Sequence, residues 1–391
     1  MFSIVSKVVR GSRSFDPART ALIAATATAT VLGLAGTFLG VLRLLSYGRA
    51  VIFQSIYLVH PDLQLFGFVA IFIMGVSYGL VPRFKNKPAP PLPFFLLLVS
   101  LVFVGNLLRL TGLGAVVGDI IVLIGFIGYT ALTIVILGRP RGFFWVSDVF
   151  ISLSPILLTV TSAARLFLQQ PWQDMRFVEL ALLGFPTAMI VGVAMRTVRF
   201  RLGANYHRGF AVVCLFSYLA ALLLLPFQQR YLQDIRRAIF LSSGIFFLAS
   251  VDIAKPLKNC FKETEMNQRD RIRHRYFTTY FTTAAAWFAA ALTLALLQGV
   301  WPFFRDGFIH SMAVGFIANT IMAYAPILMP ALMSGRAAVR GLSYAPHILI
   351  NSGNLWRIGA SMFSKLHDAY LSGLPILAGA IYFLVMVHRL R

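Results

Sequence analysis

Apolar runs close to the length of a bilayer crossing recur along the 391 residues, separated by short segments rich in Pro, Gly and charge. A membrane-spanning helix needs about 20 predominantly apolar residues. The pattern therefore predicts an all-α integral membrane protein with about twelve transmembrane helices. The predicted spans cover residues 20–45, 57–81, 93–112, 116–137, 145–168, 176–195, 208–227, 237–255, 277–299, 307–330, 343–364 and 372–388.

Two stretches of the chain repeat one pattern, the first running from His60 to Leu110 and the second from His310 to Ile358. At a shift of 248 positions, residues 67–109 align with residues 315–357 without a gap, and 13 of the 43 pairs are identical. The identical pairs include Gly, Pro, Asn and Arg, which shared apolar composition does not explain. The two stretches are an internal repeat, in which Gly67 and Gly315 are expected to be close-packing positions.

A third, fainter copy lies in the sixth span. At a shift of 117, its Gly-Phe and Gly-Val pairs at 184–185 and 192–193 match those at 67–68 and 75–76. Asp62, Glu179 and His310 then occupy equivalent positions. The spacing of four helices predicts a pseudo-threefold bundle of four-helix units within one polytopic domain, residues 1–391. The units cover approximately 20–137, 145–255 and 277–388.

The composition is 58% hydrophobic and 12% charged, yet the formal net charge is +22. The basic residues lie between apolar runs and form no aromatic-basic groove, so nucleic acid is excluded as a partner and anionic membrane lipid is favoured. With a cytoplasmic N-terminus, the inside segments hold 24 of the 35 Lys and Arg. This bias predicts a plasma-membrane protein with both termini cytoplasmic. The basic linker 255–276 is expected to be a solvated connector, with an amphipathic surface helix as the alternative.

Ionisable groups inside membrane spans are costly and usually mark function. His60 and His310 open the second and tenth spans, where two neutral imidazoles facing each other would form an axial pair for a haem iron. Arg109 and Arg357 are equivalent in the repeat and suit haem propionates. Asn106 and Asn354, one turn earlier, are expected to be supporting donors. The chain has no CxxCH motif, so such a haem b would be bound non-covalently.

Each of these residues also has a structural interpretation. The histidines could be ordinary helix-end residues, the arginines could contact lipid phosphate, and the asparagines could join helices. His347 and His367 are reserve metal ligands, with capping or loop roles as the alternative. Glu179 is expected to pair with Arg176 or Arg165, with a role in gating protons as the alternative.

The stretches HPDLQLFGFVAIFIMGVSYGLVPRF and HSMAVGFIANTIMAYAPILMP, with their GNLLR and GNLWR segments, resemble the NnrS family. That family consists of polytopic membrane proteins of the nitric oxide response that carry haem and copper. The pattern is more distantly similar to subunit I of the haem-copper oxidases, in which histidines on the second and tenth helices hold a low-spin haem. The resemblance implies the same role for His60 and His310.

The chain departs from the oxidases at the copper ligands. Its sixth span carries Glu179 where a histidine would stand, and its seventh span lacks a His-His pair. A dinuclear oxygen or nitric oxide reductase is therefore not expected. We expect a haem b protein that responds to nitric oxide or another small gas, or that passes electrons from a donor, with copper as a further possible cofactor. The alternative is a transporter or copper-handling scaffold without haem.

Overall fold

The computed structural model describes residues 16–45, 59–111, 114–168, 171–255, 268–298, 304–334, 341–363 and 371–389, and within these ranges the chain is helical apart from its connecting segments. Twelve helical rods follow one another through the described ranges. They are α2 (Pro17–Leu45), η1 with α4 (Leu63–Val69, Ala70–Phe84), α5 (Leu92–Thr111), α6 (Ala115–Leu137), α7 (Trp145–Phe167), α8 with η3 and α9 (Met175–Glu179, Leu180–Gly184, Phe185–Leu202), α10 (Arg208–Leu223), α11 (Arg230–Ser250), α13 (Gln268–Leu297), α14 with η5 and α15 (Phe304–His310, Ser311–Ala318, Asn319–Ser334), α16 (Ala345–Met362) and α18 (Gly373–Arg389).

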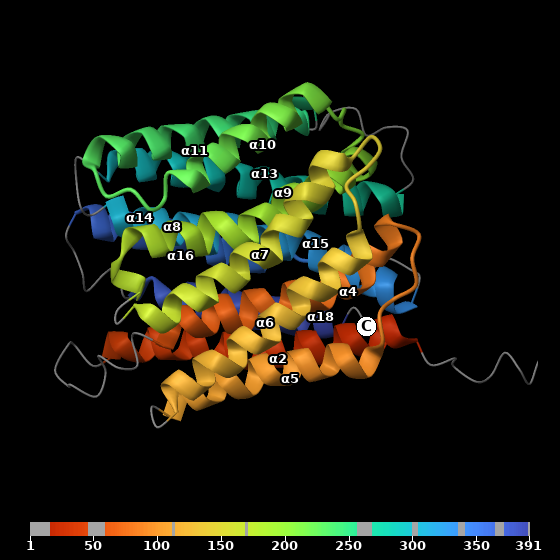
Figure 1. Cartoon of the computed structure of the whole chain (residues 1–391), viewed down its shortest axis with the longest axis horizontal. Helices are drawn as coiled ribbons and strands as arrows, with labels where there is room; N and C mark the ends of the chain where they lie inside the picture. Colours follow the sequence, from red (N-terminus) through yellow and green to blue (C-terminus); the bar gives the residue numbers. More distant parts are fainter. Residues whose placement is uncertain are drawn as a thin grey trace, which may run out of the picture.

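Eight of the described helices are long and apolar enough to cross a membrane. The chain is thus an all-α protein with multi-pass membrane character, as its apolar runs predict. The rods lie roughly parallel or antiparallel to one another and form one bundle (Figure 1).

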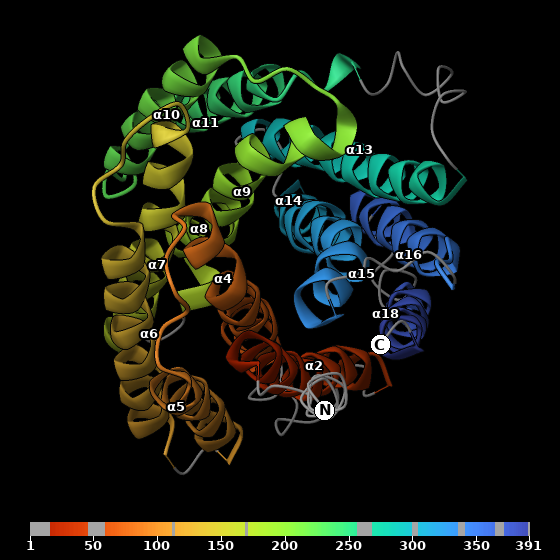
Figure 2. The ribbon, with the colours of Figure 1, turned by 90° about the vertical axis from the view of Figure 1, so that its right-hand side faces the viewer.

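The second, sixth and tenth rods, which we term the central helices, are surrounded by the other rods when the bundle is viewed from its end (Figure 2). Their most apolar windows are 83%, 89% and 83% buried, whereas the corresponding windows of the other five spanning helices are 33–44% buried. Neighbouring helices therefore contact the central helices on most sides, and any ligand bound deep in the bundle would contact them as well.

Each central helix contains a π-helical segment at the same position of the repeat. The segments η1, η3 and η5 begin at Leu63, Leu180 and Ser311. Adding 117 or 248 to the first number gives the second or the third, which are the shifts found in the sequence. Short π-helical segments are rare in proteins, and those that do occur often lie at functional sites. The three copies therefore share a local backbone irregularity as well as a sequence pattern.

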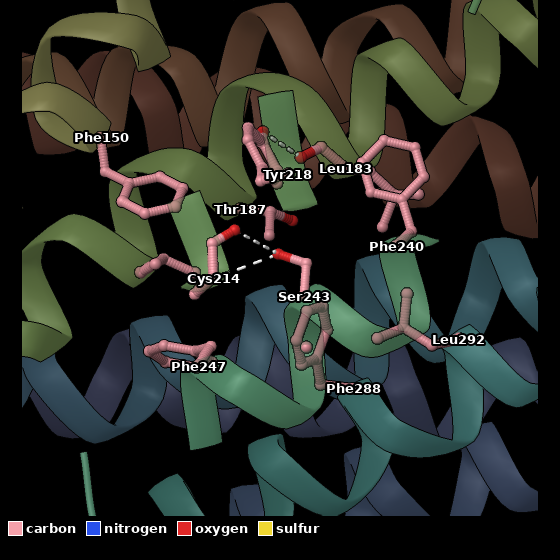
Figure 3. A pocket seen from close by; sticks show the side chains of 12 residues that line it. Phe150, Leu183, Thr187, Cys214, Tyr218, Phe240, Ser243, Phe247, Phe288 and Leu292 are labelled. Atoms are coloured by element: carbon pink, nitrogen blue, oxygen red, sulfur yellow. Dashed lines mark hydrogen bonds between the residues drawn. The ribbon is translucent and has the colours of Figure 1, made fainter. Parts of the chain in front are cut away.

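Side chains donate hydrogen bonds to carbonyl groups within the π-helical segments η3 and η5. The Tyr218 hydroxyl donates to the carbonyls of Leu183 and Gly184 at 2.6 and 2.8 Å, and the Asn319 amide donates to that of Gly315 at 2.7 Å. Tyr218 also borders a cavity of about 10 Å³ beside Cys214 and Ser243 (Figure 3). Such a volume accommodates about one water molecule.

The two ends of the bundle differ in charge. The connections at residues 85–91, 138–144 and 203–207 lie at one end, which we term the basic end. There Asp148, fully buried at the start of α7, pairs with Lys85 at 2.5 Å and with Arg196. The Arg196 guanidinium also lies over the Phe84 ring, 4.9 Å from its centroid. These contacts join the second and sixth rods to α7 at the basic end.

Two predicted helix starts are wrong because the helices extend through charged residues that were expected to lie outside them. The eighth helix begins at Arg230 rather than at residue 237, and the ninth begins at Gln268 rather than at residue 277. Charged residues were expected to lie outside the helices, but Arg236 and Arg237 are buried in α11 by pairing with a carboxylate. Residues 268–276 of the expected solvated linker belong to α13, and residues 256–267 lie outside the described ranges.

Gly315 is the close-packing position that the repeat predicts. A Cβ atom added there would lie 2.5 Å from Cγ of Trp287, so the Gly315→Ala substitution should force the ninth and tenth rods apart. We expect a loss of about 1–3 kcal/mol in the free energy of unfolding, seen as a lower thermal midpoint in detergent. Gly359→Ala is the matched control, because nothing lies within 4 Å of its added Cβ. Equal midpoints for the two variants would contradict the assignment.

Candidate functional site

A cavity of about 690 Å³ lies between α2, α18 and the central helices. Its volume falls within the roughly 300–1,000 Å³ typical of cofactor and small-molecule sites. Both His60 and His310 line it. Further polar lining residues come from the starts of the second and tenth rods, from the segment before the sixth rod, and from α2 and α16, and the walls are otherwise mainly apolar. The cavity therefore combines a polar region, at the end opposite the basic end, with apolar walls that include Ile317, Ile321, Met322, Phe383 and Leu384.

His60 is oriented by a backbone carbonyl and seated by glycines of α2. Its Nδ1 lies 2.6 Å from the carbonyl oxygen of Gly36, which can only accept, so Nδ1 carries the hydrogen. In the neutral ring the lone pair then resides on Nε2, the arrangement that suits a metal ligand. A Cβ at Gly40 would lie 2.9 Å from the imidazole. Gly36 and Gly40 thus give the ring its place against α2.

His310 has the same tautomer from a different set of partners. Its Nδ1 lies 3.0 Å from the backbone carbonyl oxygen of Asp306 and 3.3 Å from Oδ1 of the same residue. Nδ1 therefore carries the hydrogen, and Nε2 carries the lone pair. Asp306 in turn accepts hydrogen bonds from Arg357 and Ser361. Asp306, His310 and Arg357 all line the cavity.

Arg305 and Trp172 also line this cavity. The Arg305 guanidinium donates to the backbone carbonyl of Trp172 at 2.6 Å, and the Trp172 indole donates to Asp62 at 2.8 Å. Trp172 thus links the tenth rod to the second. Among the described lining residues, Arg305 is the further arginine besides Arg357, which is paired with Asp306.

The other predicted site residues lie elsewhere. Arg109 is buried, pairs with Asp119 and lies over the Phe66 ring. Asn106 and Asn354 are fully buried but do not line the cavity. The Asn106 amide donates to the carbonyl of Val102 in the preceding turn, at 2.8 Å. The cavity therefore brings together His60, His310 and Arg357 of the predicted set.

The reserve ligand His347 is also away from the cavity. His347 lies among Thr283, Asn319 and Asn351, with ring nitrogen contacts of 3.2 and 3.3 Å to these side chains, and its ring meets that of Tyr280 edge to face. It therefore belongs to a hydrogen-bonded contact among the ninth, tenth and eleventh rods. His367 lies outside the described residues.

Each central helix begins beside carboxylate–arginine pairs, and the carboxylates of the second and sixth rods are fully buried. Asp62 pairs with Arg165 at 2.7 Å, and Asp306 pairs with Arg357 at 3.0 Å. Glu179 pairs with both Arg236 at 2.5 Å and Arg237 at 3.1 Å. The predicted partners of Glu179 are therefore wrong. Arg165 instead contacts Asp62 and Asp119, and Arg176 contacts Asp174.

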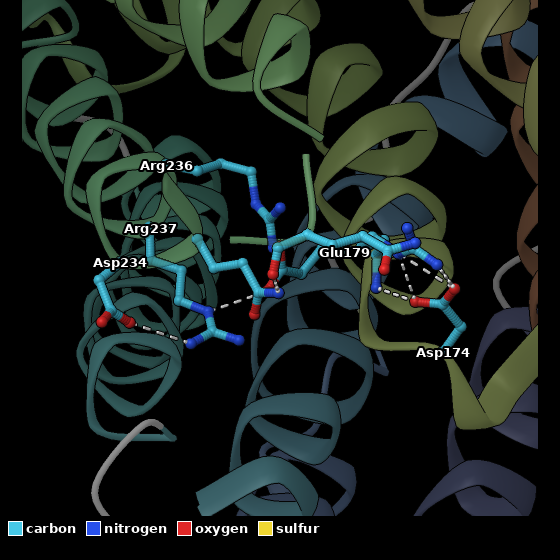
Figure 4. Close-up of polar contacts among 8 residues, drawn as sticks. Asp174, Glu179, Asp234, Arg236 and Arg237 are labelled. Carbon is cyan, nitrogen blue, oxygen red and sulfur yellow. Dashed lines mark hydrogen bonds and ion pairs between the residues drawn. The ribbon is translucent and has the colours of Figure 1, made fainter. Parts of the chain in front are cut away.

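Arg236 and Arg237 converge on Glu179 from α11, while Asp234 contacts Arg237 from the more exposed side (Figure 4). Asp174, which precedes α8, accepts hydrogen bonds from both the backbone and the side chain of Arg176. These bonds hold the pKa of the Asp174 carboxyl below its usual value. The sixth rod therefore carries charged side chains at the end that lies away from the basic end. Partners within the protein compensate these charges.

Sequence reasoning missed three parts of the site. Asp306 lies one turn before His310 and at no position marked by the repeat. Arg305 precedes it in the same turn. Gly33, Gly36 and Gly40 form a stripe on one face of α2, at spacings of three and four residues, and this stripe was the available signal for a helix packed closely against the second span.

Comparison with protein-family models and with curated proteins finds no match to this chain.

The Glu179 cluster gives a test of the buried charges. Glu179→Gln leaves Arg236, which is fully buried, and Arg237 without their carboxylate, so we expect a loss of about 3–5 kcal/mol in stability. Asp234→Asn removes a half-exposed partner of Arg237 and should change stability by less than about 1 kcal/mol. Thermal unfolding in detergent compares the two variants. A Glu179→Gln protein as stable as the Asp234→Asn protein would refute this role of the ion pairs.

Proposed function

We propose that the chain is a non-covalent haem b protein of the plasma membrane, with His60 and His310 as the two axial ligands of the iron. The observation that carries the proposal is that both histidines line one cavity of suitable volume, each with Nδ1 held by a carbonyl. Both rings thereby keep the Nε2 lone pair that iron requires.

The remaining lining also fits a haem. The apolar side chains of the tenth and twelfth rods suit a porphyrin face. Arg305 supplies positive charge for propionate carboxylates at the polar end of the cavity. Arg357 acts through Asp306 rather than as a direct propionate ligand, and Arg109 is committed to Asp119. The proposed propionate contact is therefore made by one arginine, Arg305 of the tenth rod. The sequence repeat indicated two arginines from other helices, Arg109 and Arg357.

Bound haem supplies a one-electron redox couple and an affinity for small gases such as nitric oxide. The chain's own residues orient the two imidazoles, exclude water through the apolar walls, and neutralise the negative charge of the propionate carboxylates. A function in the nitric oxide response, or in electron transfer from a membrane or external donor, follows from that chemistry. The resemblance to the NnrS family supports the first of these. Copper would require ligands beyond the two histidines committed here.

We further propose that the twelve rods span the membrane as three related units of four helices, with both termini cytoplasmic. The shared register of the three π segments supports the threefold relation. The concentration of basic connections at one end supports the orientation. Anionic lipid is then the natural neighbour of the basic end.

The absorption spectrum of purified protein supplied with haem tests the proposed cofactor. The wild-type protein should show a Soret band and the low-spin spectrum of two nitrogen ligands, and His60→Ala or His310→Ala should abolish the low-spin form. His347→Ala is the control, because His347 lies away from the cavity. A wild-type protein that takes up no haem would favour the transporter or copper-handling alternative. Unchanged spectra in both variants would refute the named ligands.

Cysteine labelling tests the orientation, in a chain whose Cys214 and Cys260 are replaced by Ser. Gln228→Cys, exposed between α10 and α11, should react with a membrane-impermeant maleimide in intact cells. Arg141→Cys, exposed at the basic end, should react only after the membrane is permeabilised. The reverse pattern would overturn the proposed orientation.

A further inference from the structure

The two histidines that line the cavity differ in what their Nδ1 hydrogen meets. The Nδ1 hydrogen of His60 is directed to the uncharged carbonyl of Gly36, at 2.6 Å. The Nδ1 of His310 faces both the carbonyl of Asp306, at 3.0 Å, and its carboxylate, at 3.3 Å. A negative charge therefore stands directly behind the His310 ring.

The Asp306 carboxylate is held in place by α16. Arg357 donates from Nε to Oδ2 at 3.0 Å and from Nη2 to Oδ1 at 3.1 Å, and the Ser361 hydroxyl donates to Oδ2 at 2.6 Å. A bidentate guanidinium contact of this kind is strong and directional. The carboxylate cannot turn away from His310 without breaking three hydrogen bonds.

A carboxylate behind a ligating imidazole orients the ring and makes it a stronger donor to the metal. We propose that Asp306 is a positioning residue that makes His310 the permanent iron ligand, so that a small diatomic gas displaces His60. The exchange breaks the iron bond to Nε2 of His60 and forms one iron bond to the gas, with no transfer of electrons or protons. This assignment rests on the proposed haem site and adds to it the side on which a gas binds.

The first measurement compares the two histidine variants, each purified with haem supplied and reduced, with carbon monoxide as the probe. His60→Ala should retain haem in a five-coordinate form and bind carbon monoxide at least tenfold faster than the wild type, because no ligand must leave. His310→Ala should lose most of its haem. Retention by His310→Ala with loss by His60→Ala would overturn the assignment. A wild-type chain without haem would instead refute the proposed function.

The second measurement isolates Asp306 and does not depend on the behaviour of His310→Ala. In the five-coordinate His60→Ala background, resonance Raman spectroscopy reports the iron–histidine stretching frequency. Adding Asp306→Asn should lower that frequency, and Asp306→Glu should restore part of it. Asp119→Asn is the matched control, because Asp119 pairs with the repeat-equivalent Arg109 away from the cavity, and it should leave the frequency unchanged. An Asp306→Asn protein with the same frequency as its parent would refute the positioning role, provided that the two proteins elute alike on size exclusion.

Discussion

The cost of an uncompensated charge inside a membrane governs the arrangement of this bundle. An ionised side chain at the centre of a span costs on the order of 3 kcal/mol or more, so charged groups there are paired. At the end opposite the basic end, the carboxylates near the starts of the central helices are each met by arginines from other helices. At the basic end Asp148 performs the corresponding task with Lys85 and Arg196. These pairs fix how the central helices lie against their neighbours.

One of these pairs also belongs to the cavity. Asp306 is held by Arg357 and Ser361, and it meets the imidazole of His310. The contact that compensates a charge thus also orients a candidate ligand. On the other wall, glycines of α2 seat His60 and allow close approach of the helices. The His310 side of the site therefore depends on the Asp306–Arg357 ion pair. The His60 side depends on glycines of α2, which have no side chain to obstruct the imidazole.

The helical architecture was readable from the sequence because apolar runs of bilayer length leave few alternatives to helices. The repeat predicted the tight position of Gly315, and it placed His60 and His310 on helices that approach each other, where both line one cavity. It did not predict the buried arginines of α11, because a sequence pattern places Arg236 and Arg237 outside the span until their partner Glu179 is known. The repeat also did not predict the partner that Arg357 has in the structure. Its carboxylate partner is Asp306, 51 residues away in the chain, at no position that the repeat marks.

The three central helices share one backbone feature and differ in their chemistry. All three central helices have the π segment, but the equivalent positions carry Asp62, Glu179 and His310. Asp62 and Glu179 pair with arginines, whereas His310 faces a cavity. One scaffold thus serves structural ion pairs in two copies and a candidate ligand in the third.

The central claim is that two imidazoles share one iron in this cavity. Near-infrared magnetic circular dichroism of the oxidised, haem-loaded wild-type protein tests it most directly, because the position of the charge-transfer band identifies the pair of axial ligands. The account predicts the band of a bis-histidine low-spin haem. A band of another ligand pair, or a protein that binds no haem, would contradict it.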